Sequence, residues 1–270
     1  MLKRQLKTLL FIGLSLIFTH SYASDTAKEK RWADQIVDSI MVGDAEWLKV
    51  GNAKILSIFT ENTTEKAIGG AIVLHGSGVH PNWDQVVRPL RSQLADYGWS
   101  TLSIQLPVLS NEAEYKEYIP LFKDVAPRIQ AGVAYFKSKG VKNIVVVAHS
   151  LGSSMAAYYL ANKPDPSIRA FVAVGVSGNM HSDDKVGYLT SLKTIKLPIL
   201  DIYGSSDLDS VLKSTKAKAD TARKAGNKNY TQLEISGANH FFDNKGDVLV
   251  KRVRGWLLKN AAGTELNINN

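Results

Sequence analysis

The chain contains no cysteine among its 270 residues. Disulfide bonds and a lipid-modified N-terminal cysteine are therefore excluded, and stability must come from a hydrophobic core, which a chain of this length can form. The sequence also lacks internal repeats, low-complexity tracts and any convincing linker. With 44% hydrophobic and 21% charged residues, its composition is that of an ordinary globular protein. We therefore expect one main globular domain.

The N-terminal hydrophobic stretch, residues 8–18, is too short to span a membrane comfortably. Basic residues precede it, and Ser21 and Ala23 place small side chains at the two positions that a signal peptidase reads. This pattern predicts a cleavable secretory signal over residues 1–23 and a periplasmic or secreted protein. Residues 24–45 are predicted to form a polar leader with a short helix.

Positive charge exceeds negative charge, and the formal net charge is +8. Much of the excess lies on a predicted helix at residues 209–225 and just beyond it, at Lys213, Lys216, Lys218, Arg223, Lys224 and Lys228. Aromatic residues that could stack on bases are not interleaved with these cations, so we do not predict nucleic-acid binding. A solvated helix face is the favoured interpretation, and weak attraction to an anionic envelope surface is the alternative.

Over residues 46–270, the predicted single domain, apolar strand-like segments alternate with helical ones. Strands are predicted at residues 47–50, 54–59, 71–74, 100–104, 144–148, 170–174, 198–203 and 231–235. Helices are predicted at residues 84–97, 121–139, 151–162, 209–225 and 246–258. This alternation indicates a mostly parallel, doubly wound α/β sheet of about eight strands with an antiparallel start. The two candidate lids, residues 105–120 and 176–196, are short, so we expect a minimal lid.

The segment Ala148-His149-Ser150-Leu151-Gly152 follows an unbroken apolar run and precedes a helical stretch. A nucleophile elbow has this context: a buried strand ends, the chain turns sharply, and a serine hydroxyl is left at the tip. The usual pattern is G-x-S-x-G, and Ala148 stands at the first glycine position. A helix N-cap is the alternative role for Ser150, but an N-cap requires neither His149 nor Gly152. We therefore predict that Ser150 is a nucleophile.

A serine nucleophile needs a base and a third group that orients the base. In sites built on an elbow, an acid and then a histidine follow the serine along the chain. Asp207 lies in the loop after the seventh predicted strand, and His240 lies in the loop after the eighth. A surface-loop histidine is the alternative for His240. Asp209 is an alternative to Asp207 but could instead cap the following helix, while Asp201 lies inside a predicted strand and is a poor rival.

On these motifs the chain resembles the α/β-hydrolase superfamily, from about residue 46 to about residue 259. The resemblance implies Ser150 as nucleophile, His240 as its base and Asp207 as the acid that orients the histidine. It also implies the α/β-hydrolase fold for the predicted sheet. Within the superfamily, residues 75–102 resemble an exported bacterial branch known only as a domain of unknown function, which brings no substrate with it.

The resemblance further implies an oxyanion hole, in which hydrogen-bond donors stabilise the negative oxygen formed during the reaction. One donor would be the backbone N–H of Leu151, directly after the nucleophile. The other would come from the loop His75-Gly76-Ser77-Gly78, with Ser77 preferred and Gly76 as second choice. His75 is expected to shape this loop by hydrogen bonding rather than to transfer a proton.

Two further residues, His149 and Trp83, are candidates for substrate binding. His149 should point aside from the tip of the elbow, where a structural role and a pocket-lining role are equally open. Trp83 could line an acyl pocket, but a buried anchoring tryptophan is the favoured interpretation. Phe241 and Phe242 are expected to pack the histidine loop against the core.

Together these residues predict an exported serine hydrolase that cleaves a carboxylic ester or thioester of a small molecule through an acyl-enzyme. We expect no cofactor and no metal, because His181, Asp183 and Asp184 have no second histidine at ligand spacing and fit a polar loop better. One alternative is a catalytically inactive protein of the same fold that binds or assembles partners in the cell envelope, which Ala148 would favour. The other alternative is an acyltransferase with the same triad.

Overall fold

The computed structural model describes residues 24–178 and 185–261. The predicted signal at residues 1–23 lies outside these ranges, and so do His181, Asp183 and Asp184. The predicted short helix of the leader is present as α1 (Thr26–Val37), which the side chain of Asp25 caps. Across the described ranges, none of the helices has the length and apolar character needed to cross a membrane.

Within the described chain, eight strands form one sheet in the order β1-β2-β4-β3-β5-β6-β7-β8. Their bounds are β1 Asp44–Val50, β2 Ala53–Thr60, β3 Gly69–Leu74, β4 Trp99–Ile104, β5 Ile144–His149, β6 Ile168–Val174, β7 Ile199–Ser206 and β8 Tyr230–Asn239. The pairs β1–β2 and β2–β4 are antiparallel, and every other neighbouring pair is parallel. The prediction of a mostly parallel sheet with an antiparallel start is confirmed.

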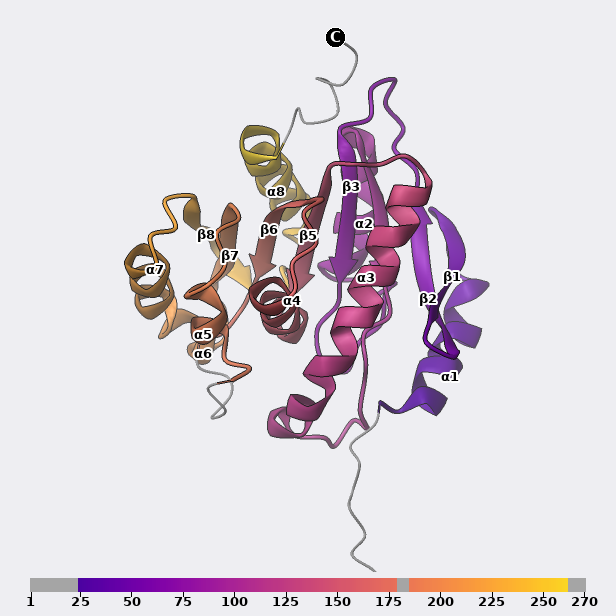
Figure 1. The fold of residues 1–270 in the computed structure, drawn as a ribbon, viewed down its shortest axis with the longest axis horizontal. Coiled ribbons are helices and arrows are strands. Elements are labelled where there is room, and N and C mark those ends of the chain that lie inside the picture. The colour runs from indigo at the N-terminus through magenta and orange to yellow at the C-terminus, as the bar shows by residue number, and fades with distance from the viewer. Residues whose placement is uncertain (1–23, 179–184, 262–270) are drawn as a thin grey trace, which may run out of the picture.

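Helices cover both faces of this sheet (Figure 1). Their bounds are α2 Val87–Gln93, η1 Leu94–Tyr97, η2 Tyr115–Leu121, α3 Phe122–Ser138, α4 Leu151–Asn162, α5 Tyr188–Leu192, α6 Asp209–Leu212, α7 Thr215–Lys224 and α8 Gly246–Asn260. One buried cluster joins α3, α4 and α5 to one face, and a second joins α2, η1 and α8 to the other. Because both faces are covered, β3 and β5 are buried at every position, which explains why both are apolar up to His149 at the end of β5.

Two predicted helices differ from the observed ones. The segment at residues 84–97 becomes helical only at Val87, after Val86 takes a positive φ of 57°, and it ends in the 3-10 helix η1. The segment at residues 209–225 consists of two short helices, α6 and α7. The break falls at Ser214, whose hydroxyl accepts a hydrogen bond from the backbone N–H of Gly178 at 2.9 Å. The expectation of a continuous helix over residues 209–225 was therefore wrong.

The interpretation of the basic residues on this segment as a solvated face also needs correction at one position. Lys218 is completely buried, and its Nζ lies 3.0 Å from the carboxylate of Asp201. Lys213 and Lys216, by contrast, are exposed and pair with acids one helical turn away, Asp209 and Asp220. Charge spacing alone could not separate the buried lysine from its exposed neighbours, because burial here depends on how α7 packs against β7.

The parallel strands bring their carboxyl ends to one edge of the sheet, at the bottom in Figure 1. The strands β5, β6, β7 and β8 are consecutive neighbours there. The residues that directly follow them are Ser150, Gly175, Asp207 and His240. Open α/β sheets place their sites at this edge. The topology therefore brings four positions that are far apart in sequence into one neighbourhood.

Candidate active site

The turn between β5 and α4 has the geometry of an elbow. Ser150 is held at φ 52° and ψ −122°, a conformation that side-chain-bearing residues rarely adopt, and its N–H donates to the carbonyl of Val174 at 2.8 Å. A side chain at Gly152 would bring Cβ to 2.2 Å from the carbonyl oxygen of His75, so only glycine fits there. At the first glycine position of the pattern, Ala148 is 1% exposed and its methyl group packs in the core. Alanine is therefore accommodated without opening the turn.

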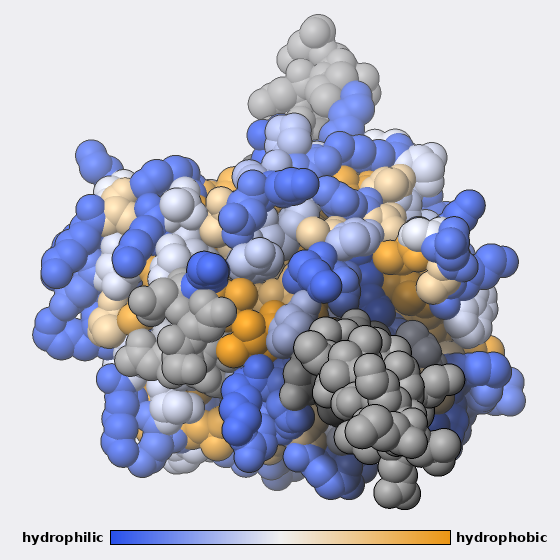
Figure 2. Space-filling model, turned by 60° about the horizontal axis from the view of Figure 1, so that its bottom comes forward, coloured by the Kyte–Doolittle hydropathy of each residue, from blue (hydrophilic) through white to orange (hydrophobic). Residues whose placement is uncertain are grey.

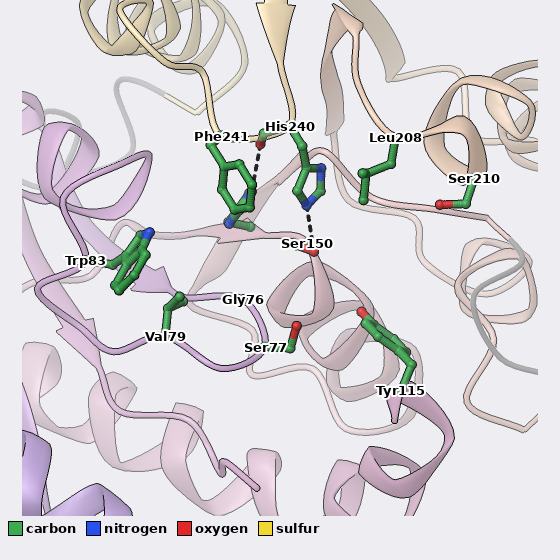
Figure 3. A pocket seen from close by; sticks show the side chains of 11 residues that line it. Gly76, Ser77, Val79, Trp83, Tyr115, Ser150, Leu208, Ser210, His240 and Phe241 are labelled. Carbon is green, nitrogen blue, oxygen red and sulfur yellow. Dashed lines mark hydrogen bonds between the residues drawn. The ribbon is translucent and has the colours of Figure 1, made fainter. Parts of the chain in front are cut away.

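Three side chains at this edge form a continuous chain of hydrogen bonds, of which Figure 3 shows the contact between His240 and Ser150. His240 Nε2 lies 3.0 Å from Ser150 Oγ, and His240 Nδ1 lies 2.6 Å from Asp207 Oδ1. Since the carboxylate can only accept, Nδ1 carries the proton in the neutral ring and Nε2 is free to accept from the serine hydroxyl. The structure thus brings together the three residues that the sequence suggested as nucleophile, base and orienting acid.

The carboxylate of Asp207 is buried and held by backbone donors as well as by the histidine. The N–H of Leu208 donates to Oδ1 at 2.7 Å, and the N–H of Gly204 donates to Oδ2 at 3.3 Å. Burial by itself would raise the pKa of this carboxyl, but the hydrogen bond and charge of His240 and the two backbone donors lower it below its usual value. The group is therefore a carboxylate at neutral pH, as an orienting partner for His240 must be.

Gly175, which the sequence motifs did not single out, follows β6 and lies beside Asp207 and His240. Its φ is 58°, and a Cβ there would lie 3.1 Å from two ring atoms of His240 and 3.3 Å from Asp207 Oδ2. The missing side chain allows the imidazole and the carboxylate to meet above the end of β6. A glycine directly after a predicted strand was the available signal.

The loop after β3 lies beside Ser150 and is fixed by His75. The ring of His75 is fully buried; Nδ1 donates to the carbonyl of Gly76 at 2.8 Å, and Nε2 accepts from the N–H of Leu106 at 2.9 Å. Burial lowers the pKa of His75 to about 3, so the ring stays neutral. These contacts agree with a loop-shaping role. Ser77 is exposed and lines the same cavity as Ser150, and Leu151 begins α4, where the first amide groups have no acceptor inside the helix.

A cavity of about 370 Å³ opens above Ser150. It is lined by Gly76, Ser77, Val79, Trp83, Tyr115, His149, Ser150, Leu208, Ser210, His240 and Phe241. Phe241 and Leu208 are 41% and 47% exposed, and apolar surface gathers amid hydrophilic residues on this side of the molecule (Figure 2). Phe242 packs in the core as expected, whereas Phe241 does not: it faces the cavity. Tyr115, Leu208, Ser210 and Phe241 were not foreseen as lining residues.

His149 and Trp83 both line the cavity. His149 Nε2 lies 3.1 Å from the carbonyl oxygen of His240, and the two rings are 4.9 Å apart. Burial, with the nearby His240, lowers the pKa of His149 to about 3. Trp83 is partly buried and packs against the second core cluster while it lines the cavity; its Nε1 donates to Gln85 at 2.9 Å. Gln85 in turn donates to Asp243 at 2.8 Å, which ties this wall of the cavity to the loop that carries His240.

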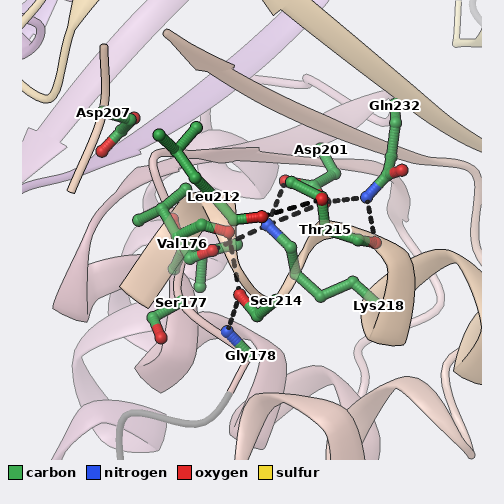
Figure 4. A network of polar contacts seen from close by, with 12 residues as sticks. Val176, Ser177, Gly178, Asp201, Asp207, Leu212, Ser214, Thr215, Lys218 and Gln232 are labelled. Carbon is green, nitrogen blue, oxygen red and sulfur yellow. Dashed lines mark hydrogen bonds and ion pairs between the residues drawn. The ribbon is translucent and has the colours of Figure 1, made fainter. Parts of the chain in front are cut away.

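The two other acids considered for the site have different surroundings. Asp201 lies within β7 and bonds to Lys218 and, at 2.9 Å, to Gln232 (Figure 4). The hydroxyl of Tyr230 also donates to it at 2.6 Å. Asp209 is exposed and pairs with Lys213. Over residues 24–178 and 185–261, no group of three or more His, Asp or Glu side chains is arranged to hold a metal ion.

The profile of the family described as "Protein of unknown function (DUF3530)" matches residues 23–118 and 120–259. No curated protein matches the chain significantly in sequence. Among solved structures, Est1E from Butyrivibrio proteoclasticus is similar with a TM-score of 0.64 and 17% identity, covering 81% of this chain and 98% of that one. The dienelactone hydrolase from Anabaena variabilis gives a TM-score of 0.63 and 20% identity, with coverage of 81% and 98%.

A third similar structure is the esterase Pf2001 from Pyrococcus furiosus, with a TM-score of 0.65 and 16% identity, covering 82% of this chain and 93% of that one. In all three comparisons the match covers nearly the full length of the solved structure. At these identities the likeness concerns the fold, which is the α/β-hydrolase fold that the motifs suggested. The expected fold is therefore confirmed by topology and by comparison alike.

Proposed function

We propose that this chain, which belongs to the family described as Protein of unknown function (DUF3530), is a serine hydrolase. Its proposed substrate is a small, uncharged carboxylic ester or thioester. The observation that supports this most strongly is the hydrogen-bonded series from Asp207 through His240 to Ser150 at the floor of a cavity. A serine that merely capped α4 would need neither partner.

In the proposed mechanism, His240 Nε2 takes the proton of Ser150 as Oγ attacks the carbonyl carbon of the substrate. The carbonyl oxygen becomes an oxyanion and accepts hydrogen bonds from the N–H of Leu151 and from the loop that contains Gly76 and Ser77. His240 then gives its proton to the leaving oxygen or sulfur, and the acyl group stays on Ser150. Asp207 holds the imidazole in the required tautomer and stabilises its charged form.

The second half of the reaction repeats these steps with water. His240 removes a proton from water as the water oxygen attacks the acyl carbon, and the same donors stabilise the second oxyanion. Collapse of this intermediate returns the proton to Ser150 Oγ and releases the carboxylic acid. No cofactor takes part in the proposed steps.

The choice of an uncharged substrate rests on the lining of the cavity. Its described walls contain no Lys, Arg, Asp or Glu, and the low pKa of His149 keeps that ring neutral. Moving a charged group of a substrate from water into this cavity without a partner would cost on the order of several kcal/mol of desolvation free energy. The volume of about 370 Å³ suits a short acyl group better than a long chain.

A series of p-nitrophenyl esters with acyl chains of rising length tests this proposal. We expect turnover of the short esters and a loss of activity to background in Ser150→Ala. A matched control is Ser154→Ala. Ser154 is buried in α4, the helix that follows Ser150, and its hydroxyl has no partner among the described residues. Preference for long chains, or unchanged turnover in Ser150→Ala, would contradict the proposal.

We further propose that the protein works outside the cytoplasm after removal of residues 1–23. The support is the basic, apolar and small-residue succession in that segment. Edman sequencing of the protein recovered from the cell envelope or medium should begin at Ser24. Recovery of only the full-length chain from the cytoplasm would contradict export.

A further inference from the structure

Tyr115 lies at the start of η2, in the connection between β4 and α3, and its side chain lines the cavity. In Figure 3, its hydroxyl points toward Ser150 from the side opposite His240, close to the hydroxyl of Ser77. The hydroxyl oxygen is shielded from solvent, although the residue as a whole is only partly buried. Packing alone does not explain a shielded tyrosine hydroxyl that points toward Ser150 Oγ.

The segment that carries Tyr115 is held firmly in place. Glu114 and Glu117 form a reciprocal capping box at the start of η2. One turn further along, the hydroxyl of Tyr118 accepts a hydrogen bond from the N–H of Leu109 at 3.2 Å, and its ring lies 6.4 Å from that of Tyr115. The tyrosine hydroxyl is thus presented by a fixed element, as preorganised stabilisation of charge requires.

Burial raises the pKa of Tyr115 well above 10, and a hydrogen bond with Ser150 opposes this only in part. The hydroxyl therefore keeps its proton at any pH at which the enzyme would work. It can act as a neutral hydrogen-bond donor but not as a base.

The position of His240 decides which substrate atom Tyr115 would meet. His240 must reach the leaving group to protonate it, so the leaving group lies on the histidine side of Ser150 Oγ. The carbonyl oxygen then points to the other side, where the hydroxyls of Tyr115 and Ser77 lie. As negative charge develops there, the Tyr115 hydrogen bond can pass from Ser150 to the oxyanion.

We propose that Tyr115 is a catalytic residue whose hydroxyl donates a hydrogen bond to the oxyanion, in addition to the backbone donors at Leu151 and in the loop after β3. The proton stays on the tyrosine throughout, and no bond to Tyr115 is made or broken. This inference rests on the proposed function. It adds to that function a side-chain donor from η2, an element that the elbow motif does not include.

The test compares Tyr115→Phe with Tyr118→Phe on the best p-nitrophenyl ester. Loss of one oxyanion donor should lower kcat by about 100-fold with little change in KM. The matched variant Tyr118→Phe loses a hydroxyl from the same helix, and its effect should be on the melting temperature while kcat stays within about threefold of the parent value.

A trifluoromethyl ketone that forms an oxyanion adduct with Ser150 supplies the second readout. Its affinity should fall in Tyr115→Phe by the same factor as kcat/KM, which a purely structural role would not produce. A folded Tyr115→Phe protein with kcat within about threefold of the parent, or with unchanged ketone affinity, would overturn the inference while the hydrolase function stands. An unmodified protein that turns over no ester and binds no ketone would overturn both.

Discussion

Two buried carboxylates, one inside β7 and one directly after it, have different hydrogen-bond partners. Asp201, inside the strand, is enclosed by Lys218, Tyr230 and Gln232, all of which donate to it (Figure 4). Asp207, directly after the strand, bonds to His240. The second ring nitrogen of His240 lies within hydrogen-bonding distance of the hydroxyl of Ser150 (Figure 3). Both acids are out of the solvent, but only one of them has a path to a cavity.

The difference lies in the partner of each acid. Lys218 is completely buried, so its ion pair with Asp201 links α7 to β7 and β8 but cannot contact a substrate. A histidine can gain and lose a proton near neutral pH, and its two nitrogens can serve two partners at once. Burial of a carboxylate therefore does not by itself mark a candidate active site; the identity of its partner and the direction of that partner's second nitrogen distinguish Asp207 from Asp201.

The largest expected effect separates the two acids by activity. Asp207→Asn should lower kcat by about 10⁴-fold, because the amide can no longer hold His240 in the tautomer that accepts from Ser150. Asp201→Asn should leave kcat per folded molecule within about twofold. Steady-state kinetics on one ester, corrected for the folded fraction, measure both. Equal losses of kcat in the two variants would remove the distinction.

The next effect separates the acids by stability. Lys218→Met leaves the carboxylate of Asp201 buried without its cation and should lower the free energy of unfolding by about 3–5 kcal/mol. Urea denaturation followed by tryptophan fluorescence measures this change. The conclusion that this pair holds α7 and β7 together would be wrong if Lys218→Met unfolded at the same urea concentration as the parent protein.

A smaller effect, on the pH dependence of the free energy of unfolding, distinguishes the surroundings of Ser150, which include the buried histidines His75 and His149, from the Asp201 network. Burial lowers the pKa of His75 and His149 to about 3, whereas both should titrate near 6.5 when unfolded. The unfolded chain therefore takes up more protons below pH 6.5, so each histidine's contribution is complete above that pH and is lost as the pH falls toward 3. Each should remove about 2 kcal/mol of stability between pH 7 and pH 5.

Urea titrations at pH 7 and pH 5 check this expectation. His149→Phe should make the pH dependence shallower, and Ser154→Ala, which removes no titratable group, should leave its slope unchanged. An equally steep pH dependence in His149→Phe would show that the acid sensitivity arises elsewhere.

The smallest effect concerns Asp209, the exposed neighbour of Asp207. Its partner Lys213 is exposed as well, and such pairs contribute little to stability. Asp209→Asn should therefore change neither the melting temperature nor kcat measurably. A large loss of activity in this variant would mean that the wrong acid has been assigned to His240.

Much of this arrangement could be predicted from the sequence, because parallel strands end at one edge. Ser150, Asp207 and His240 each lie in the loop that follows a predicted strand, so the parallel arrangement of those strands was enough to suggest their proximity. Their chemical roles stay predictions. The eight strands were likewise visible as mainly apolar segments, since strands covered on both faces are mostly apolar; Asp201 in β7 is a buried exception that pairs with Lys218.

Other features depend on packing that no local pattern reveals. Lys218 has the same spacing as its exposed neighbours, and only the approach of α7 to Asp201 buries it. Tyr115 and Phe241 reach the cavity because η2 and the loop after β8 fold over the sheet edge from different directions. At the break between α6 and α7, the hydroxyl of Ser214 accepts a hydrogen bond from Gly178, a residue far away in sequence.

The most direct test of the central claim is fluorophosphonate labelling of the folded protein, followed by mass spectrometry of its peptides. A serine activated by His240 should take up one phosphonyl group at Ser150, and the labelling should be lost in Ser150→Ala and slowed strongly in His240→Ala. A folded protein that remains unlabelled, or one that is labelled at another residue, would contradict the account.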